Sequence, residues 1–363
     1  MMGTGTSERN TTVKVFDFFS GCGGASCGFD AAGMDVAFAL DCDQEAQRTY
    51  TANFPDVHFE LADIRAVEAE EVQLHVDAAR TSPVLFCGCA PCQPFTKQNT
   101  TRPDLGDDDR IPLLLRFADF IEACVPDLVF VENVPGLQHF DSTSQPFDDF
   151  LSRLGECNYY VDFRSIRLMK YGVPQSRRRL VLVASRHGDI QLPPETHGPE
   201  TPNEDYETVR DWIGHLPPIA AGEEHPAVRN HRAARLSALN IERIKVTPEG
   251  GSHRDWPEAL KLDCHKDFSG YSDVYGRMSW DAPASGLTTR CISYSNGRFG
   301  HPDQDRAISI REAACLQTFP DEFAFEGALN SMARQIGNAV PVRLAEVVGK
   351  HFVSHLKDVG VVS

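Results

Sequence analysis

The segment CGCAPCQPFTKQN, residues 87–99, has the residue types and spacing that point most directly to covalent chemistry. Cys92 lies between two prolines in a strand-to-loop turn, and a thiol exposed in such a turn can act as a nucleophile. Cys87 and Cys89 instead continue an apolar strand, which is typical of buried, inert thiols. The C-x-C-x2-C spacing also fits zinc, but a tetrahedral site needs a fourth soft ligand, usually from a second pair, and no such pair stands out. The sequence therefore predicts a cysteine nucleophile and no metal.

A glycine-rich turn, SGCGG at residues 20–24, ends the first apolar run of the chain. Its three glycines let the backbone approach a ligand closely, where a side chain would obstruct it. Asp41, about twenty residues further on, is placed to hydrogen-bond a ribose. Asp63, after a later short strand, is placed to accept a hydrogen bond from an adenine amino group. The glycine spacing alone would equally fit a dinucleotide-binding loop or a tight turn.

Apolar runs separated by helical segments predict the elements that must hold these residues. Strand-like runs lie at 13–19, 36–40, 57–62, 84–89, 128–134 and 179–186, and helical stretches at 42–54, 113–124 and 333–356. In the last stretch Val342, Ala345, Val348 and Phe352 share one side. Strands that alternate with helices at this spacing indicate an α/β fold with a mixed, mostly parallel sheet, whose sites lie at the carboxyl ends of the strands.

The composition changes at His187. Residues 187–285 are rich in proline, histidine and acids and have poor periodicity, whereas strong patterns return at 308–323. The histidines of this stretch do not have metal-ligand spacing. We expect one domain formed by residues 12–186 and 300–363, with a smaller domain, residues 187–299, inserted between its two parts.

Six short blocks occur in a fixed order between residues 15 and 345. They are FFSGCGG, Pro91-Cys92-Gln93, Glu132-Asn133-Val134, Gln175-Ser176-Arg177-Arg178-Arg179, REAACLQTFPDEF and Gln335-Ile336-Gly337-Asn338-Ala339-Val340-Pro341. In these blocks and in their order the chain resembles the cytosine-5 DNA methyltransferase family, in particular its bacterial and phage members. Because nearly the whole chain is covered, the ordered set is far more specific than any one motif.

The resemblance implies a Rossmann-like domain that binds S-adenosylmethionine, a smaller target-recognition domain, and methyl transfer to a cytosine flipped out of duplex DNA. Cys92 would add to carbon 6 of the ring, which makes carbon 5 electron-rich. Glu132 would protonate or hydrogen-bond ring nitrogen 3 as a carboxyl group held in its acid form. Arg177 and Arg179 would stabilise charge around the base, with Arg179 contacting the exocyclic oxygen. The sequence names no base for removal of the carbon-5 proton, and a water can serve.

The same resemblance assigns two further sets of residues. Those predicted to bind the cofactor are Phe19, Ser20, Gly21, Gly23, Gly24, Asp41, Cys42, Asp63, Ile64, Pro91, Leu113, Asn338 and Val340. Those predicted to contact DNA are Gln93, Thr96, Gln175, Arg277, Thr288, Thr289 and Arg290, with Arg254 as a further candidate. The loop from Gln93 to about Ile111 is expected to close over the flipped cytosine. Family members commonly carry Asp-x-Arg-Gly near its end, whereas here Asp108-Asp109-Arg110 is followed by Ile111 and Pro112.

The formal net charge of −17 at first argues against a polyanionic partner. Residues 163–188 nevertheless contain seven basic residues and no acid, so a local patch can face DNA while the rest of the surface stays acidic. No apolar run approaches the ~20 residues needed to span a bilayer, and the polar N-terminus lacks the apolar core of a secretory signal. Eleven cysteines without an export signal predict free thiols in a reducing compartment. We expect a cytoplasmic, nucleoid-associated monomer with no obligatory protein partner, able to function alongside a restriction endonuclease.

Three other functions fit parts of the sequence. A nicotinamide oxidoreductase would account for the glycine-rich turn but leaves Pro-Cys-Gln, Glu-Asn-Val and the C-terminal blocks unexplained. A catalytically inactive DNA-binding regulator would be expected to lack the nucleophile or the acid, and both are present. One branch of the family methylates transfer RNA and usually carries Cys-Phe-Thr in its recognition region. That tripeptide is absent from this chain, so duplex DNA is the favoured substrate.

Overall fold

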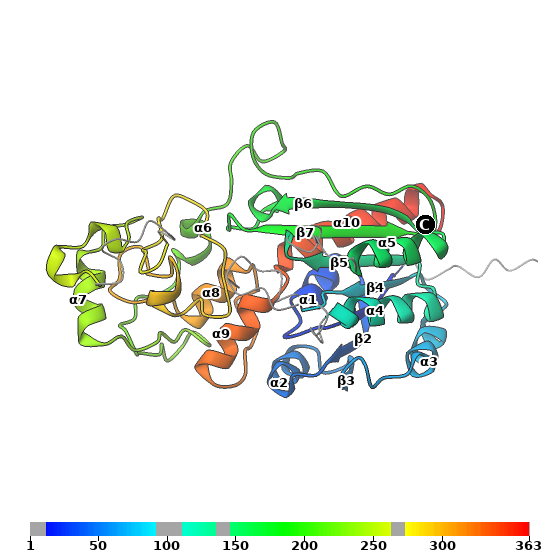
Figure 1. The fold of residues 1–363 in the computed structure, drawn as a ribbon, viewed down its shortest axis with the longest axis horizontal. Helices are drawn as coiled ribbons and strands as arrows, with labels where there is room; N and C mark the ends of the chain where they lie inside the picture. Colours follow the sequence, from blue (N-terminus) through cyan, green and yellow to red (C-terminus); the bar gives the residue numbers. More distant parts are fainter. Residues whose placement is uncertain (1–11, 92–110, 136–145, 263–272, 363) are drawn as a thin grey trace, which may run out of the picture.

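The computed structural model describes residues 12–91, 111–135, 146–262 and 273–362. Its centre is a seven-stranded sheet with the strand order β3-β2-β1-β4-β5-β7-β6 (Figure 1). The strands are β1 (Lys14–Phe18), β2 (Asp35–Asp41), β3 (His58–Leu61), β4 (Val84–Gly88), β5 (Leu128–Asn133), β6 (Tyr160–Arg167) and β7 (Arg178–Ser185). Neighbours among β1 to β5 pair in parallel, whereas β7 is antiparallel to both β5 and β6. The predicted α/β fold with a mixed, mostly parallel sheet is confirmed.

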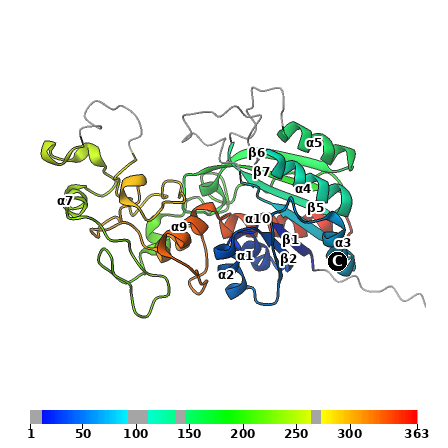
Figure 2. The ribbon, with the colours of Figure 1, turned by 60° about the horizontal axis from the view of Figure 1, so that its bottom comes forward.

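Helices cover both faces of the sheet (Figures 1 and 2). One face packs against α1 and α10, and the other against α3, α4 and α5. The helices of the sheet domain are α1 (Gly24–Ala31), α2 (Gln44–Asn53), α3 (Ala69–Ala79), α4 (Ile111–Cys124), α5 (Pro146–Glu156) and α10 (Val342–Asp358). The central strands are therefore buried on both sides, which explains why their sequences are continuous apolar runs rather than alternating ones.

Phenylalanines form much of the core on the α3–α5 face. Phe16 and Phe18 of β1, Phe38 of β2 and Phe86 of β4 are almost fully buried and contact one another, and Phe18 and Phe86 also contact Phe117 of α4. Burying each such side chain stabilises the fold by about 1.5–3 kcal/mol. The carboxyl ends of β1, β2 and β4 are thereby held in fixed positions, and the candidate site residues follow these ends.

The C-terminal segment forms two helices, where the sequence predicted one from 333 to 356. Helix α9 (Leu329–Asn338) ends before Ala339, and α10 begins after Pro341. The proline fixes its own φ and disfavours helix at the residue before it, so the chain turns there. The predicted apolar side of 342–352 is correct, since all four of its residues are buried. Strand β6 and helices α3 and α5 were not predicted.

The chain between β7 and α8 (Ile310–Leu316) has little regular structure. Its first part runs along the sheet domain, where Ile190 and Leu192 join the apolar core, and residues 209–309 lie beside one end of that domain, on the left of Figure 1. Its described helices are short, α6 (Val209–Ile213) and α7 (Ala238–Val246). Helices α8 and α9 lie between this region and the sheet. One apolar core contains residues of this region and of both helices. The expected division into residues 12–186 with 300–363 and residues 187–299 stays a prediction.

Candidate active site

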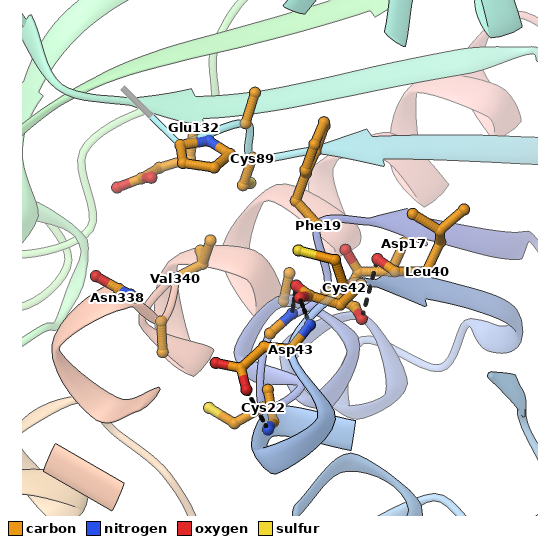
Figure 3. A pocket seen from close by; sticks show the side chains of 18 of the residues that line it. Asp17, Phe19, Cys22, Leu40, Cys42, Asp43, Cys89, Glu132, Asn338 and Val340 are labelled. Carbon is orange, nitrogen blue, oxygen red and sulfur yellow. Dashed lines mark hydrogen bonds between the residues drawn. The ribbon is translucent and has the colours of Figure 1, made fainter. Parts of the chain in front are cut away.

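A cavity of about 390 Å³ lies at the carboxyl ends of the parallel strands. It is lined by the loop after β1, the ends of β2, β4 and β5, and the turn between α9 and α10. Most of the described residues that were predicted for cofactor binding or catalysis line this cavity. They are Phe19, Ser20, Gly21, Asp41, Cys42, Asp63, Ile64, Pro91, Leu113, Glu132, Arg177, Arg179, Asn338 and Val340. Figure 3 shows Glu132 and Cys89 on one side of this cavity, and Cys42 and Asp43 on the opposite side. Residues distant in sequence thus form one pocket, at the place expected for a parallel sheet.

Asp41 holds the glycine-rich turn in place. Its carboxylate accepts hydrogen bonds from the backbone N–H of Gly21 at 2.8 Å and of Asp43 at 2.9 Å. Burial raises the pKa of Asp41, and the two N–H donors oppose that rise. Gly21 has a φ of 53°, and a side chain placed there would meet open space, so its backbone faces the cavity. Phe19 also has a positive φ, 59°, a strained conformation of the kind that clusters at functional sites.

Asp63 lies at the rim and forms an ion pair with Arg65. The Arg65 guanidinium lies 2.5 Å from the Asp63 carboxylate and lowers the pKa of that carboxyl group. Next to it, Ile64 is buried and presents an apolar surface to the cavity. This part of the pocket therefore combines a carboxylate acceptor with an apolar side chain.

Two glycines predicted as cofactor contacts are also needed for packing. A Cβ on Gly24 would lie 2.4 Å from the Val340 carbonyl oxygen, and a Cβ on Gly23 would lie 2.8 Å from the Phe54 ring. Neither glycine is among the residues that line the cavity. They permit close packing of the first turn of α1, and their contact with the cofactor stays a prediction.

Glu132 and Arg179 form a buried ion pair at the edge of the cavity. Arg179 Nε donates to Glu132 Oε1 at 2.6 Å, and both side chains are only about a tenth exposed, at 10% and 11%. Burial raises the pKa of Glu132, while the Arg179 charge opposes that rise. Burial likewise lowers the pKa of Arg179. The antiparallel pairing of β5 with β7 brings these two residues together. A carboxyl group with a raised pKa beside a guanidinium can both supply a proton and stabilise a carbonyl oxygen.

Asn133 ties the end of β5 to the segment that leads into Cys92. Its side-chain amide donates to the Ala90 carbonyl at 3.1 Å, and its Oδ1 accepts from the Val134 N–H at 2.7 Å. Pro91 is exposed at the cavity and is the last residue described before the gap. Cys92, Gln93, Thr96 and the loop to Arg110 lie outside the described residues. The contact of Asn133 with Ala90 nonetheless fixes the position of the chain just before that loop.

The turn after α9 completes the cavity with Asn338 and Val340, two of the residues predicted to bind the cofactor. Arg177 reaches the same turn, since its guanidinium donates to the Gly337 carbonyl at 3.3 Å. Its side-chain stem lies against Gly286, where a Cβ would be 3.0 Å from its Cγ. Arg177 therefore joins β7, the segment near 286 and the α9 turn.

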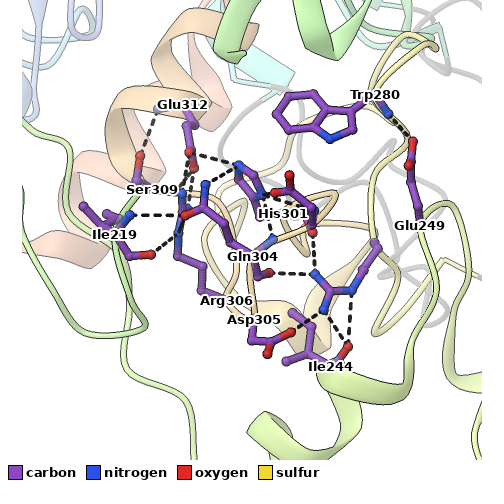
Figure 4. Close-up of polar contacts among 12 residues, drawn as sticks. Ile219, Ile244, Glu249, Trp280, His301, Gln304, Asp305, Arg306, Ser309 and Glu312 are labelled. Atoms are coloured by element: carbon purple, nitrogen blue, oxygen red, sulfur yellow. Dashed lines mark hydrogen bonds and ion pairs between the residues drawn. The ribbon is translucent and has the colours of Figure 1, made fainter. Parts of the chain in front are cut away.

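Two predicted DNA contacts are buried instead. The Gln175 amide group donates to Leu316 O and Gln317 Oε1 and accepts from the Leu287 N–H. The guanidinium of the other, Arg277, binds backbone carbonyls, among them those of Ile244, His301 and Gln304, and pairs with Asp305 at 2.6 Å. Figure 4 labels these four partners. Because these hydrogen-bonding groups are occupied inside the protein, neither side chain presents them to DNA. Both side chains have structural contacts here, and their contact with DNA stays a prediction.

The other predicted contacts that are described lie on one segment. Thr289 and Arg290 are exposed, and Thr288 is half-buried. The Thr288 hydroxyl accepts the backbone N–H of Arg290 at 3.3 Å, which shapes the turn. The further candidate Arg254 is exposed and lies in a short 3-10 helix away from this segment in sequence.

The cavity also contains residues that sequence reasoning missed. Asp17 is 1% exposed, and its carboxylate accepts the Ser26 hydroxyl at 2.6 Å. Burial raises the pKa of Asp17 to about 6. Arg334 of α9 reaches Asp43 at 3.0 Å and Glu45 at 3.1 Å. The position of Asp17 at the end of a predicted strand could have indicated it, whereas Arg334 lies inside a helix and gave no such signal.

Comparison with known proteins assigns the family. The sequence pattern of the C-5 cytosine-specific DNA methylase family matches residues 13–354. The chain is 41% identical over 342 residues to the type II methylase M.HgiDII of Herpetosiphon aurantiacus, covering 93% of this chain and 94% of that protein. It is 32% identical over 341 residues to the type II methyltransferase M1.HphI of Haemophilus parahaemolyticus, covering 93% and 86%. The chain belongs to the C-5 cytosine-specific DNA methylase family.

It is a DNA (cytosine-5-)-methyltransferase related to enzymes of type II restriction-modification systems, a family that uses S-adenosylmethionine. Its fold agrees with that of a protein described as a DNA modification methyltransferase encoded within an Escherichia coli prophage. The TM-score is 0.74 at 23% identity, over 95% of this chain and 100% of that one. A DNMT2 structure from Spodoptera frugiperda has a TM-score of 0.61 at 19% identity, over 94% and 100%. At these identities the likeness establishes the fold alone.

Two further observations concern the described residues only. No helix there is long and apolar enough to cross a membrane. Within the same ranges, no group of three or more His, Cys, Asp or Glu side chains is arranged to hold a metal ion. The nine cysteines described, Cys22, Cys27, Cys42, Cys87, Cys89, Cys124, Cys157, Cys291 and Cys315, are free thiols.

Proposed function

We propose that this methyltransferase transfers a methyl group from S-adenosylmethionine to carbon 5 of a cytosine flipped out of a specific duplex DNA sequence, through a covalent adduct with Cys92. The Glu132–Arg179 pair carries this proposal. It places a buried carboxyl group with a raised pKa at the same pocket as the strand end that leads to Cys92. The pairing is suited to a pyrimidine ring, which offers a nitrogen to Glu132 and a neighbouring carbonyl oxygen to Arg179.

The remaining pocket residues suit the cofactor. The cavity volume of about 390 Å³ lies in the usual range for a small-molecule site, about 300–1,000 Å³. Asp41 and Asp63 would accept hydrogen bonds from the ribose and the adenine amino group, and Ile64 and Phe19 would contact the purine. Gly21 and the Asn338–Val340 turn would surround the amino-acid part. Bound S-adenosylmethionine supplies a methyl group on a sulfonium, which is transferable to a carbon nucleophile.

The chain's own residues account for the activation of the ring. The Cys92 thiolate forms a bond to carbon 6, and the ring electrons move toward nitrogen 3, where the proton held by Glu132 meets them. Arg179 stabilises the adjacent oxygen and keeps Glu132 in place. As carbon 5 takes the methyl group, the carbon 4–nitrogen 3 double bond reforms and the nitrogen 3 proton returns to Glu132. The proton that remains on carbon 5 then leaves to water. The carbon 5–carbon 6 double bond then reforms and the Cys92 thiolate is expelled, which restores the enzyme.

The type II relatives support a role in restriction-modification, in which methylation protects a sequence from a partner endonuclease. The enzyme would act as a monomer on chromosomal DNA in the cytoplasm, because each strand of a palindrome can be methylated in turn. Sequence choice would belong to the region between β7 and α8, with Thr288, Thr289 and Arg290 at its edge nearest the active site.

The test uses the full-length protein, tritiated S-adenosylmethionine, mixed-sequence duplex DNA and transfer RNA, with Cys92→Ala in parallel. We expect label on DNA cytosine from the wild type and none from Cys92→Ala, and bisulfite sequencing of the product then gives the recognition sequence. Label on transfer RNA alone would overturn the DNA substrate but keep the mechanism. No label on either nucleic acid, with cofactor binding intact, would overturn the proposed activity.

A further inference from the structure

Asp17, the fourth residue of β1, is a buried carboxyl group at the wall of the cofactor pocket (Figure 3). The residue is 1% exposed, and burial raises its pKa to about 6. An ionised carboxyl group in such surroundings lowers the stability of the fold unless another group compensates its charge. A strongly perturbed acid in a cleft is a candidate for a functional role, so the source of that compensation matters.

The groups that hold Asp17 are neutral. Its Oδ2 accepts the Ser26 hydroxyl of α1 at 2.6 Å, and that hydroxyl lies 2.8 Å from the Tyr50 hydroxyl of α2. The Cys87 thiol of β4 forms a further hydrogen bond with the carboxylate. Within the part of the chain that the structure describes, no lysine, arginine or histidine pairs with Asp17. These donors orient the carboxylate but leave its negative charge in place.

The cations of the pocket are paired with other groups. Four arginines line it, and its described lining contains no lysine or histidine. Their partners are Asp63 for Arg65, the Gly337 carbonyl for Arg177, Glu132 for Arg179 and Asp43 for Arg334. Asp41, the other lining carboxylate there without a cation, binds two backbone N–H groups instead. The pocket therefore has an unbalanced negative charge at Asp17, which a cation entering the pocket would balance.

The methyl donor and its product differ in one charge. S-adenosylmethionine carries a sulfonium cation, whereas S-adenosylhomocysteine, which remains after transfer, has a neutral sulfur. The two molecules share every other ionic group. Opposite unit charges about 12 Å apart, at an effective dielectric constant of ~20, change an affinity about tenfold. A fixed anion at the wall of the pocket thus favours the charged donor over the neutral product.

We propose that Asp17 is a specificity-determining residue that makes the pocket select the cationic methyl donor over its neutral, demethylated product. The inference rests on the proposed cofactor. It gives the pocket a selectivity that shape alone does not provide, since donor and product differ by a single methyl group. Transfer removes the sulfonium charge and with it the attraction to Asp17, so the product leaves more readily. The stability that this buried carboxylate costs is then explained by its use in the pocket.

The selection should depend on pH, because only the ionised carboxylate attracts a cation. The titratable groups that face Asp17 are Asp41 of β2, Tyr50 of α2, Cys87 of β4, and Cys22 and Cys89 of the adjoining loops. Burial raises the pKa of Tyr50, Cys22 and Cys87, so these groups stay neutral near pH ~6. A bound cation stabilises the ionised form of Asp17, so donor affinity should rise as pH increases through the Asp17 pKa of about 6.

Isothermal titration calorimetry of the full-length protein with each ligand, at pH ~5 and pH ~7, tests this selection. At pH ~7, Asp17→Asn should lower the ratio of S-adenosylmethionine affinity to S-adenosylhomocysteine affinity about tenfold. At pH ~5 the ratio should fall only about twofold, since wild-type Asp17 is then mostly protonated. Asp41 and Cys89 are present in both proteins, so the comparison isolates Asp17.

Two further variants show whether the charge itself is responsible. Ser26→Ala keeps the carboxylate but loses a hydrogen bond that lowers its pKa, so the midpoint of the pH dependence should move to a higher pH. The control Asp35→Asn removes an exposed carboxylate that pairs with Lys14 at the opposite end of β2 from the pocket. This control should leave the affinity ratio unchanged at both pH values.

Kinetics separate an effect of charge from a change in pocket shape. In Asp17→Asn the KM for S-adenosylmethionine should rise, while the single-turnover rate at saturating donor should not fall, because the charge stabilises the bound donor at least as much as the transition state. An affinity ratio that is the same in wild type and Asp17→Asn at both pH values would overturn this inference. An equal loss of affinity for both ligands would also overturn it, since Asp17 would then act on a group that they share. A wild type that binds neither ligand would instead mark the failure of the proposed cofactor.

Discussion

The buried Glu132–Arg179 pair makes a quantitative prediction about stability. Its atoms lie 2.6 Å apart, and the two side chains are about a tenth exposed. Removing one partner of a buried pair leaves an uncompensated charge, which typically costs 3–5 kcal/mol. Because the pair borders a cavity, we expect Arg179→Met to lower the free energy of unfolding by about 3 kcal/mol at neutral or higher pH. Glu132→Gln keeps a neutral acceptor for the guanidinium and should cost less, about 1–2 kcal/mol.

The pH dependence of Arg179→Met distinguishes this reasoning from a simple loss of packing. Without the guanidinium, the pKa of Glu132, which burial already raises, rises further. The unfolded carboxyl group titrates near pH ~4.3, so between that value and the higher folded pKa the folded state binds more protons. The stability of the variant therefore falls as pH rises through that window and stays level above it. We expect a small deficit relative to wild type near pH ~5 and the full deficit near pH ~8.

Urea denaturation at those two pH values measures the effect, with Arg164→Met as a control. Arg164 pairs with Asp162 on the surface with its side chain 58% exposed, so its loss should cost under about 1 kcal/mol at both pH values. The Glu132→Gln/Arg179→Met double variant should be less destabilised than the sum of the single variants. For activity, Glu132→Gln should reduce the methylation rate by about 10²–10⁴ and leave cofactor affinity nearly unchanged. An Arg179→Met deficit that is equal at both pH values, or a Glu132→Gln variant of normal rate, would refute the assigned roles.

Three further variants, one of them with a control on α5, test other parts of the protein. Asp17 has a folded pKa of about 6, above its unfolded value near ~3.9, so wild-type stability should fall as pH rises between these values. Asp17→Asn should therefore be up to about 3 kcal/mol more stable than wild type near pH ~8 and similar near pH ~4, and a constant difference in urea titrations would contradict this. Gly337→Ala places a Cβ 2.2 Å from a backbone oxygen, so it should lower the free energy of unfolding by about 1–3 kcal/mol and weaken DNA binding. The control Gly155→Ala lies on α5 with open space around it and should raise the free energy of unfolding by about 0.5–1 kcal/mol. Asp41→Asn replaces a carboxylate oxygen by an amide N–H₂, which cannot accept the backbone N–H groups of Gly21 and Asp43. Calorimetry should therefore show cofactor affinity reduced roughly tenfold. An unchanged affinity would show that Asp41 does not bind the cofactor.

The sequence predicted best the residues that follow strand ends. Asp41, Asp63 and Glu132 each end an apolar run, and the parallel pairing of these strands brings their ends to one edge of the sheet. An apolar run that ends in an acidic residue indicates both where a strand ends and which chemical group lies there. The fold and most of the residues that line the pocket could therefore be predicted from the sequence. Strand β6 was missed because it is an edge strand with polar, exposed positions along much of its length.

The surroundings of four predicted residues could not be foreseen from the sequence, because the type of a residue does not indicate whether it is buried. Gln175 and Arg277 have the donors that DNA recognition uses, and the protein uses those donors to join its own segments. Gly23 and Gly24 belong to a ligand-binding turn, yet what requires glycine there is the closeness of Phe54 and Val340. In each case the contact that determines the residue's surroundings comes from a segment distant in sequence. A local sequence pattern does not contain that information.

Arg177 shows how the early and late parts of the chain act as one unit. Its stem lies against Gly286 and its guanidinium binds the carbonyl of Gly337, the residue before Asn338 of the cofactor pocket. Gly337 in turn contacts the backbone of Thr288, a residue predicted to contact DNA. Close packing of this kind resists movement, because even one added methyl group would force the backbone to shift. We therefore expect this junction to hold the end of the predicted recognition region in a fixed position relative to the pocket that contains Glu132, although the region itself has little regular structure.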